Sequence, residues 1–356
     1  MFMCFFVFIL FYICSVVFGM SVKSKTGLRG SRRKFLVLVS LLLVVVVLLV
    51  CSLFVYQSLM ADDGFVRVKS AVELRDAVNN VEVCVQLSIA LTEDISLGSA
   101  LTIPAGADIT LRSVGGAGFF KLVGLTGGSV ITVQSGGRLT LDGVIVTHVA
   151  DSIGNGVIVE SGGALIMIDG VISGNTAFYG GGVQVHSGGV FELIGGVISG
   201  NTASRDDAGY GGGVSNAGTF KMYGGKISDN TVAGRGGGVS NAGDFSMFGG
   251  VISGNAASNS GGGVDCTGSF SMFGGVISNN VANVSGGGAF IWVSFYVLSG
   301  DTFSSFMMSG GTISDNYALN GYGGGVYTYN GTFDKLGGEI FDNTAAVGND
   351  VHQWSG

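Results

Sequence analysis

The clearest pattern in the chain is an alternation of apolar and small polar residues that repeats every 25 residues in its most regular part. Two consecutive lines, 218–242 and 243–267, follow the same pattern and have the same residue at 12 of their 25 positions, including the Gly-Gly pair, the Asn and the Gly-Gly-Gly-Val motif. Each line holds three short apolar pieces, and Gly-Gly or Asn separates one piece from the next. A unit of this size cannot bury an apolar face alone, so the copies have to stack on one another. The pattern therefore predicts a solenoid.

The Asn of an Ile-Ser-x-Asn motif marks the period. Successive Asn residues are 26, 29, 25, 25, 36 and 27 residues apart, and a His lies in the same register 27 residues before the first of them. The whole column is His148, Asn175, Asn201, Asn230, Asn255, Asn280, Asn316 and Asn343. We expect eight coils over about 136–350, in a repeat domain 136–356 with a C-terminal cap. The strand spacing then gives a rod about 40 Å long.

Apolar residues of one register also recur from coil to coil. One column is almost entirely Phe, from Phe191 to Phe333, and the column two residues further on is mostly Met. A third column consists of Val183, Val214, Val239, Val264, Ala289 and Val326. The three apolar pieces of each line, such as Phe220/Met222, Ile227 and Val239, are separated by short turns and predict an all-β fold with three parallel strands in each coil.

Residues 57–135 differ from the repeats and are expected to form an N-terminal cap and irregular first coils. Ser70 and Glu73 have the spacing of a capping box, and apolar residues follow at helical spacing, which predicts a short helix over 70–79. A solenoid has to cover its open end, because an uncovered coil exposes both a sheet edge and an apolar core. The helix is placed to do this, although an ordinary surface helix is an alternative.

The N-terminal part has the pattern of a membrane anchor. Residues 35–55 hold no charge, and as a helix they would be about 31 Å long, which matches the hydrocarbon core of a bilayer. We therefore expect a signal anchor over 35–56, a cytoplasmic basic loop over 20–34, and an extracellular domain after it. Cleavage near Ala61 would give a secreted form instead. Residues 1–19 are also apolar and are either a second span or the product of a mis-assigned start at Met1 rather than Met20.

The amino-acid composition excludes several classes of fold, partner and cofactor. Gly accounts for 65 residues and Pro for 1, which excludes collagen and makes the glycines turn residues. All 24 acidic residues but only 11 of the 17 basic ones lie after residue 56, so we do not expect nucleic acid as a partner. The five cysteines have neither the spacing of a disulfide framework nor that of a zinc site, and we expect no cofactor.

The array resembles right-handed parallel β-helix proteins of the pectate-lyase-like superfold. More narrowly, it is similar to adhesin-like surface proteins, including chlamydial polymorphic membrane proteins, which carry Gly-Gly-Ala/Val and x-x-x-Asn repeats. The matching motifs here are 180–183, 211–214, 236–239, 261–264, 286–289 and 323–326, each paired with one Asn of the column. In this chain Ile-Ser rather than Phe precedes the Asn. The resemblance covers about 60% of the chain and implies a right-handed parallel β-helix, whereas fold alone does not imply function.

The Asn column has two interpretations. Repeated Asn side chains can ligate cations or contact sugars, but they also tolerate left-handed turns and hydrogen-bond their stacked neighbours. We favour a structural ladder at a bend, with His148 as its first member rather than a catalytic residue.

We find no catalytic or metal-binding residues in the pattern. Glycoside hydrolysis needs two carboxylates about 5–10 Å apart, which a β-helix supplies from one register of neighbouring coils. The outward position after each Gly-Gly-Gly-Val/Ala is occupied by Gln184, Ser215, Ser240, Asp265, Phe290 and Tyr327, without an adjacent pair of carboxylates. Asp315 and Asp342 fall at turn positions, and Asp206 and Asp207 fall in an inserted loop.

One region departs from the repeats. The 36-residue coil contains an insertion with aromatic residues, and we take Trp292, Phe295, Tyr296 and Phe303 as a candidate binding loop. The alternative is that this loop folds back over the apolar end of the last coil. Asn283 and Asn330 begin N-glycosylation sequons, which matter only if this part is extracellular.

These observations favour a non-enzymatic, adhesin-like surface protein that binds extracellular glycans or protein partners through its rod. A polysaccharide lyase or glycoside hydrolase is one alternative, and acidic side chains converging on one exposed face would support it. A structural surface-layer spacer is the other.

Overall fold

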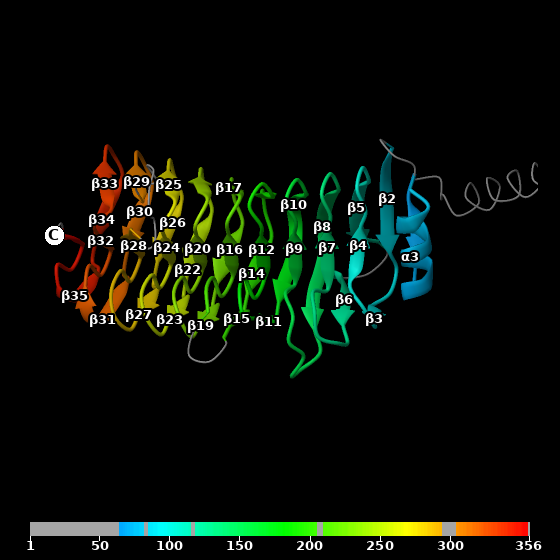
Figure 1. Cartoon of the computed structure of the whole chain (residues 1–356), viewed down its shortest axis with the longest axis horizontal. Helices are drawn as coiled ribbons and strands as arrows, with labels where there is room; N and C mark the ends of the chain where they lie inside the picture. The colour runs from blue at the N-terminus through cyan, green and yellow to red at the C-terminus, as the bar shows by residue number, and fades with distance from the viewer. Residues whose placement is uncertain (1–63, 82–84, 115–117, 205–208, 294–303, 355–356) are drawn as a thin grey trace, which may run out of the picture. The chain divides into compact units, whose positions relative to one another are not determined.

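The computed structural model describes residues 64–81, 85–114, 118–204, 209–293 and 304–354, all within one compact unit, Ala61–Gly356. These residues form a parallel β-solenoid of about ten turns, with helix α3 (Ala71–Asn79) at the N-terminal end (Figure 1). The expected segments 1–19, 20–34 and 35–56 and the site near Ala61 lie outside the described residues. Within the described ranges, no helix is both long and apolar enough to cross a membrane.

Sheet A is the largest of three sheets and holds 19 strands. Its N-terminal strands are β1 (Val66–Val68), β2 (Gln86–Leu91), β3 (Ile95–Leu97), β5 (Asp108–Ser113), β6 (Phe120–Gly124), β8 (Arg138–His148) and β10 (Ala164–Ser173). Beyond β10, a Gly-Gly pair divides each long strand into two rows. The first row is β13 (Val190–Leu193), β17 (Thr219–Met222), β21 (Asp244–Met247), β25 (Ser269–Met272), β29 (Ser305–Met308) and β33 (Thr332–Lys335). The second is β14 (Val197–Ser199), β18 (Lys226–Ser228), β22 (Val251–Ser253), β26 (Val276–Ser278), β30 (Thr312–Ser314) and β34 (Glu339–Phe341).

Sheet B contributes one strand to every turn of the solenoid. Its ten strands are β4 (Leu101–Ile103), β7 (Ile131–Val133), β9 (Val157–Val159), β12 (Val183–Val185), β16 (Val214–Asn216), β20 (Val239–Asn241), β24 (Val264–Cys266), β28 (Ala289–Trp292), β32 (Val326–Tyr329) and β36 (Val351–Trp354). These strands pair in parallel and in the register that the valine column predicted.

Sheet C is a side of the solenoid that the sequence pattern did not reveal. Its seven strands follow the Asn column and are β11 (Thr176–Ala177), β15 (Thr202–Ala203), β19 (Thr231–Val232), β23 (Ala256–Ala257), β27 (Val281–Ala282), β31 (Tyr317–Tyr322) and β35 (Thr344–Val347). Each regular coil therefore has four strands, not three. Most strands of sheet C are two residues long, too short to show an alternation.

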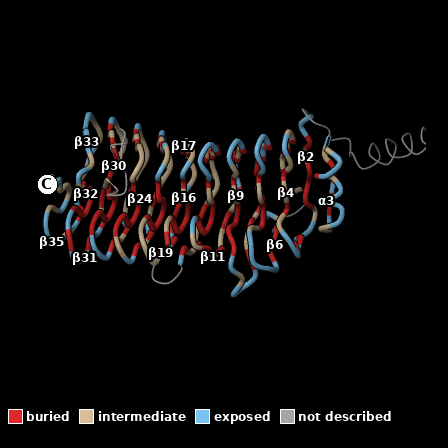
Figure 2. The backbone as a smooth tube through the Cα atoms, viewed as in Figure 1, coloured by how far each residue is buried: buried red, intermediate tan, exposed pale blue. Residues whose placement is uncertain are grey.

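The core lies inside the coils, and the aromatic column fills much of it. Successive Phe rings from Phe191 to Phe333 stack with centroids 4.4–4.8 Å apart. Figure 2 shows the buried segments along the inside of the coils and the exposed ones at the turns. In the last coil, the inward residues Phe333, Ile340 and Val351 are only half-buried, because no further coil follows them within the described residues.

A continuous ladder of amide hydrogen bonds runs through the bend between sheets A and C. Asn255 is a typical member: its Nδ2 donates to Asn280 Oδ1 at 2.9 Å and to the Ile227 carbonyl at 3.0 Å. The Asn255 backbone N–H donates to the same Asn280 oxygen at 3.0 Å. In turn, Asn255 Oδ1 accepts bonds from the side chain and backbone of Asn230. Every amide proton and both lone pairs of each repeated side chain thus have a place within the stack.

Different residues close the two ends of this ladder. At the first end, His148 Nδ1 lies 2.8 Å from Asn175 Oδ1, and its Nε2 lies 3.0 Å from the Gly128 carbonyl. At the last end, Asn343 Nδ2 donates to Asp350 Oδ1 at 3.0 Å, so a carboxylate replaces the next amide.

The Gly-Gly-Gly motif is required by two different constraints. Its first residue takes a left-handed conformation, as at Gly236 with φ of 75°. Its third residue packs against the ladder: a Cβ on Gly238 would lie 2.7 Å from the Gly263 carbonyl oxygen and 3.0 Å from Asn255 Nδ2. The third glycine therefore lets the Asn ladder and sheet B approach one another.

The expected N-terminal helix is present. Ser70 caps α3, accepting a hydrogen bond from the Glu73 N–H, and the Lys69 N–H donates to the Glu73 carboxylate. Leu74 and Val78 are fully buried against the first strands, including β1 and β4. Helix α3 lies at the N-terminal end of the rod (Figure 1), where these two side chains cover apolar surface.

Replacing one ladder residue should destabilise the solenoid. Asn255→Ala leaves buried donors and acceptors in the neighbouring coils unpaired, which costs about 3 kcal/mol or more. We expect a lower urea midpoint by circular dichroism. The matched control Asn279→Gly should change it little, because Asn279 is exposed, has φ of 57°, and occupies a position held by Gly in other coils.

A methyl group at the third glycine should also be destabilising. Gly238→Ala places a Cβ against backbone oxygen and the ladder amide, and we expect a loss of about 1–3 kcal/mol from overpacking. Gly98→Ala is the control, since a Cβ there meets nothing within 4 Å. Equal urea midpoints for the two variants would contradict the tight approach of coils at Gly238.

Candidate functional site

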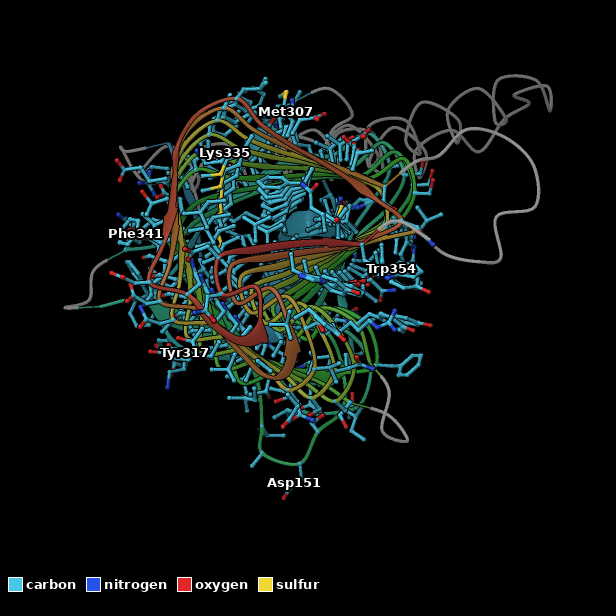
Figure 3. All side chains as sticks on the ribbon, turned by 90° about the vertical axis from the view of Figure 1, so that its left-hand side faces the viewer. Asp151, Met307, Tyr317, Lys335, Phe341 and Trp354 are labelled. Atoms are coloured by element: carbon cyan, nitrogen blue, oxygen red, sulfur yellow. The ribbon has the colours of Figure 1, made fainter. Side chains whose placement is uncertain are left out.

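The outward side of sheet B changes from polar to aromatic in its last coils. Its central outward column runs from Gln184 through Ser240 and Asp265 to the aromatic residues of the last three strands. We call the aromatic residues of these strands the aromatic face, which comprises Phe290, Trp292, Tyr327, Tyr329, His352 and Trp354. Figure 3 looks along the rod and labels Trp354 and Phe341 on opposite sides of the coil.

The rings of the aromatic face stack on each other along the rod. Tyr329 and Trp354 are nearly parallel, with centroids 4.6 Å apart. Tyr322 joins them from the end of β31, at 5.5 Å from Tyr327 and 4.8 Å from His352. Phe290 and Tyr327 are almost buried, whereas Tyr322 and Trp354 are each 42% exposed. The arrangement is a rigid surface with apolar ring edges and polar substituents.

A polar cluster lies beside the aromatic face and involves three consecutive coils. Asp265 accepts a hydrogen bond from the Trp292 indole N–H at 2.9 Å and one from the Ser240 hydroxyl at 3.4 Å. The Arg235 guanidinium lies 4.2 Å from the Trp292 ring centroid and 5.6 Å from that of Phe290. Trp292 is thus fixed by a hydrogen bond at its edge and a cation–π contact on its face.

Arg235 can reach Trp292 because small residues follow it in its register. The position before each Gly-Gly-Gly motif is Tyr179, Tyr210, Arg235, Ser260, Ser285 and Tyr322. Parallel bridges join the first three of these residues. Ser260 and Ser285 are buried, and their short side chains leave room for the guanidinium beside the next coils.

Burial controls the electrostatics of the cluster. It raises the pKa of Asp265 from 3.8 to about 7, although Arg235 and the hydrogen bonds from Trp292 and Ser240 oppose the shift. A carboxyl group in this position can hold or release a proton near neutral pH. Burial also raises the pKa of Tyr327, with a smaller contribution from Tyr322.

The structure changes the assignment of the candidate binding loop. Trp292 is the last residue of β28 and pairs with Tyr329, so it belongs to sheet B and not to the inserted loop. Its hydrogen bond to Asp265 explains why it stays on the sheet. The other three expected loop residues, Phe295, Tyr296 and Phe303, lie outside the described residues.

The Asn column is not accessible to a ligand. Asn175 to Asn316 are fully buried, and Asn343 and His148 are 3% and 7% exposed. The polar atoms of these side chains form hydrogen bonds within the ladder or with adjacent backbone. The sequon residues Asn283 and Asn330 are by contrast exposed, and the Asn320 side chain donates to Asn283 Oδ1 at 2.9 Å.

Acidic residues do not gather into a metal site in the part of the chain that the structure describes. Asp315 and Asp342 do occupy one register of neighbouring coils, each with a left-handed backbone just after the paired residues Ser314 and Phe341. They flank the ladder at a turn. The expected loop acids, Asp206 and Asp207, fall in a range that is not described.

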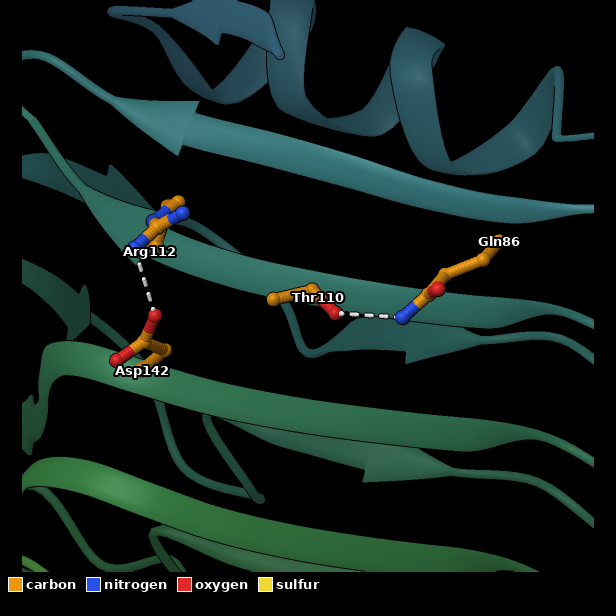
Figure 4. A network of polar contacts seen from close by, with 4 residues as sticks. All are labelled: Gln86, Thr110, Arg112 and Asp142. Atoms are coloured by element: carbon orange, nitrogen blue, oxygen red, sulfur yellow. Dashed lines mark hydrogen bonds and ion pairs between the residues drawn. The ribbon is translucent and has the colours of Figure 1, made fainter. Parts of the chain in front are cut away.

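The outward face of sheet A in the first coils carries charge pairs instead. Arg112 and Asp142 form an ion pair at 2.9 Å, and Gln86 donates to Thr110 on the same face (Figure 4). The register of β5 and β8 places residues of opposite charge beside each other twice: Asp108 beside Arg138, and Arg112 beside Asp142. Half-exposed pairs of this kind contribute little to stability.

Two buried polar features escaped the sequence interpretation. The first is a second amide stack, in which Asn216 Nδ2 donates to Asn241 Oδ1 at 2.7 Å and Asn241 Nδ2 approaches Cys266 Sγ at 3.4 Å. The Val-Ser-Asn sequence that recurs at 214–216 and 239–241 was its signal. The second is Asp265, which was counted among exposed positions, whereas the aromatic residues of the next coil bury it.

The titration of Asp265 should give stability a distinctive pH dependence. Its folded pKa of about 7 lies above its unfolded value of 3.8. The folded state therefore holds the proton more tightly, so stability is highest below pH 4 and falls as pH rises toward 7. The contribution is on the order of 4 kcal/mol at most. Urea unfolding at several pH values should show that Asp265→Asn removes this slope, and an unchanged slope would contradict the assignment.

Comparisons with known proteins do not extend this description. No family model matches the chain, and neither a characterised protein nor a solved structure matches it. The fold is therefore established at the level of a parallel β-solenoid. What the solenoid binds has to be argued from its own residues.

Proposed function

We propose that this protein is a membrane-anchored or secreted, adhesin-like surface protein, a right-handed β-helix that binds extracellular glycans or protein partners without catalysing a reaction. The aromatic face is the observation that carries the proposal. Trp and Tyr are enriched among the residues that dominate the energetics of binding surfaces, and here they gather on one side of the last three turns, with Arg235 contacting Trp292 from two coils before. The acidic body makes nucleic acid an unsuitable partner.

The construction of the face fits recognition of sugars better than recognition of charged ligands. Tyr322 and Trp354, each 42% exposed, combine an apolar ring with a hydroxyl or an indole N–H group, which matches the mixed apolar and polar surface of a pyranose. The cluster at Asp265 holds Trp292 in place before a ligand arrives. Preorganised aromatic side chains lose little conformational entropy on binding, and this favours affinity.

A second candidate function is cleavage of a polysaccharide. The specific observation in its favour is Asp265, whose pKa of about 7 is suited to a general acid. Against it, the carboxylate is 2% exposed and already engaged by Trp292 and Ser240. Release of reducing ends or unsaturated products from pectin-like polysaccharides, abolished by Asp265→Asn, would establish this alternative. A chain that neither binds nor cleaves would be a structural spacer.

Binding should depend on the aromatic face alone. We expect Trp354→Ala in the full-length protein to weaken binding on a glycan array at least about tenfold, because truncating an exposed Trp side chain of the aromatic face removes a large contact area. Phe341→Ala is the matched control: Phe341 is an exposed aromatic residue of β34 on the opposite side of the coil (Figure 3), and its loss should leave glycan binding unchanged. Equal losses in both variants, or no glycan binding by the unsubstituted chain, would contradict the proposal.

A further inference from the structure

A row of large apolar side chains lies exposed at the corner between the two rows of strands in sheet A. The row continues the strand register one residue beyond the Met column, immediately before the Gly-Gly pair or, at Ile168 within β10, before Asp-Gly. We call it the apolar ridge; it consists of Ile168, Ile194, Tyr223, Phe248, Phe273 and Leu336. The corner lies between the labelled Lys335 and Phe341 in Figure 3, away from Trp354.

The ridge is regular and exposed. Tyr223, Phe248 and Phe273 stack with centroids 5.0 Å apart and are each 44–45% exposed, and Leu336 is 73% exposed. Ser309 occupies the remaining position between Phe273 and Leu336. Because the rings use their faces to stack on each other, they present their edges to a partner. An exposed apolar row of this length, interrupted at Ser309, marks an interaction site.

The charges beside the ridge show which partner fits it. On one flank, five successive coils carry Lys221, Ser246, Ser271, Met307 and Asp334. On the other flank, the same coils carry Lys226, Val251, Val276, Thr312 and Glu339. Both flanks are therefore basic at the first of these coils, acidic at the fifth, and uncharged between.

We propose that the apolar ridge is the interface for a second copy of this chain, which lies alongside the first in the opposite direction. A two-fold axis at Phe273 is the symmetry that matches the charges: it places Lys221 opposite Asp334 of the other copy, and Lys226 opposite Glu339. Each pair occurs twice, as an isologous interface requires. The same axis places Phe273 against its own counterpart and Tyr223 against Leu336.

A second copy of the chain suits the apolar ridge because its coils repeat at the same spacing. Both copies have the same coil spacing of about 4.8 Å, so contacts made at one coil recur at the next. A parallel pair would instead oppose Lys221 to Lys226 and Asp334 to Glu339, which is unfavourable. Lys221 has a competing partner within its own chain, Glu192 at 3.4 Å, so the Lys226–Glu339 pair is the better test.

The exposed area is sufficient for a weak to moderate dimer. An aromatic side chain offers roughly 150–250 Å², so the four half-exposed side chains from Tyr223 to Leu336 contribute on the order of 400 Å² per copy. Two copies and the flanking valines bring the total to about 1,000 Å², the lower limit for a specific interface.

Cysteine cross-linking in the full-length protein tests the register. Phe273→Cys, which lies on the axis, should form a disulfide dimer under mild oxidation, above the background of the unsubstituted chain. Tyr223→Cys should not cross-link with itself but should do so with Leu336→Cys. Self-cross-linking of Tyr223→Cys would indicate a parallel pair and overturn the proposal. Thr231→Cys, an exposed position on sheet C, is the control that should stay at background.

Charge-reversal substitutions test whether the Lys226–Glu339 pairs stabilise the association of the two copies. We expect the full-length chain in detergent to sediment as a concentration-dependent dimer, and Lys226→Glu to weaken association about tenfold at low salt. Adding Glu339→Lys to that variant should restore the dimer, with circular dichroism reporting the fold of each. A chain that stays monomeric, binds neutral lipid vesicles through the ridge instead, or is not rescued by the double exchange would overturn the proposal.

Discussion

The close approach of the Asn ladder to sheet B is the constraint on which the rest of the structure depends. Each amide is buried and has hydrogen-bond partners in the coils on both sides, so no member can be lost without leaving polar groups unpaired. This demand explains the glycines beside it, because the third residue of each Gly-Gly-Gly motif leaves no space for a Cβ. The glycine-rich coils that the structure describes are thereby held in regular strands and turns, although 65 of the 356 residues of the chain are Gly.

The period of the sequence was enough to predict the parallel stack, the Phe and Met columns and the register of sheet B. In a solenoid, equal positions in successive repeats become neighbours in space, so a pattern along the chain translates directly into contacts. Sheet C escaped prediction because strands such as Thr202–Ala203 are too short to alternate. Gly238 was taken for a turn residue, since the sequence does not show what lies across the coil from it.

The cluster at Asp265 was beyond the sequence for a different reason. Its contacts depend on how far a side chain reaches along the rod, and Arg235 contacts Trp292 two coils away. The period of the sequence assigns each residue to a column, but it does not show which columns contact each other. The same holds for the outward position of β24, which alternation marks as exposed and which the aromatic face of the following coils buries.

Coil length and ladder geometry are independent of each other. Asn280 and Asn316 are 36 residues apart and joined by a 3.0 Å bond, like residues 25 apart elsewhere. Residues inserted between two members of the ladder therefore do not change its hydrogen-bond geometry. By the same argument, a whole coil can be added without altering the others. Duplication or loss of the DNA that encodes one line, such as 218–242, would add or remove one coil. Such events would shift the aromatic face along the rod axis in steps of about 4.8 Å, so the length of the rod can change in evolution without a change in the other coils.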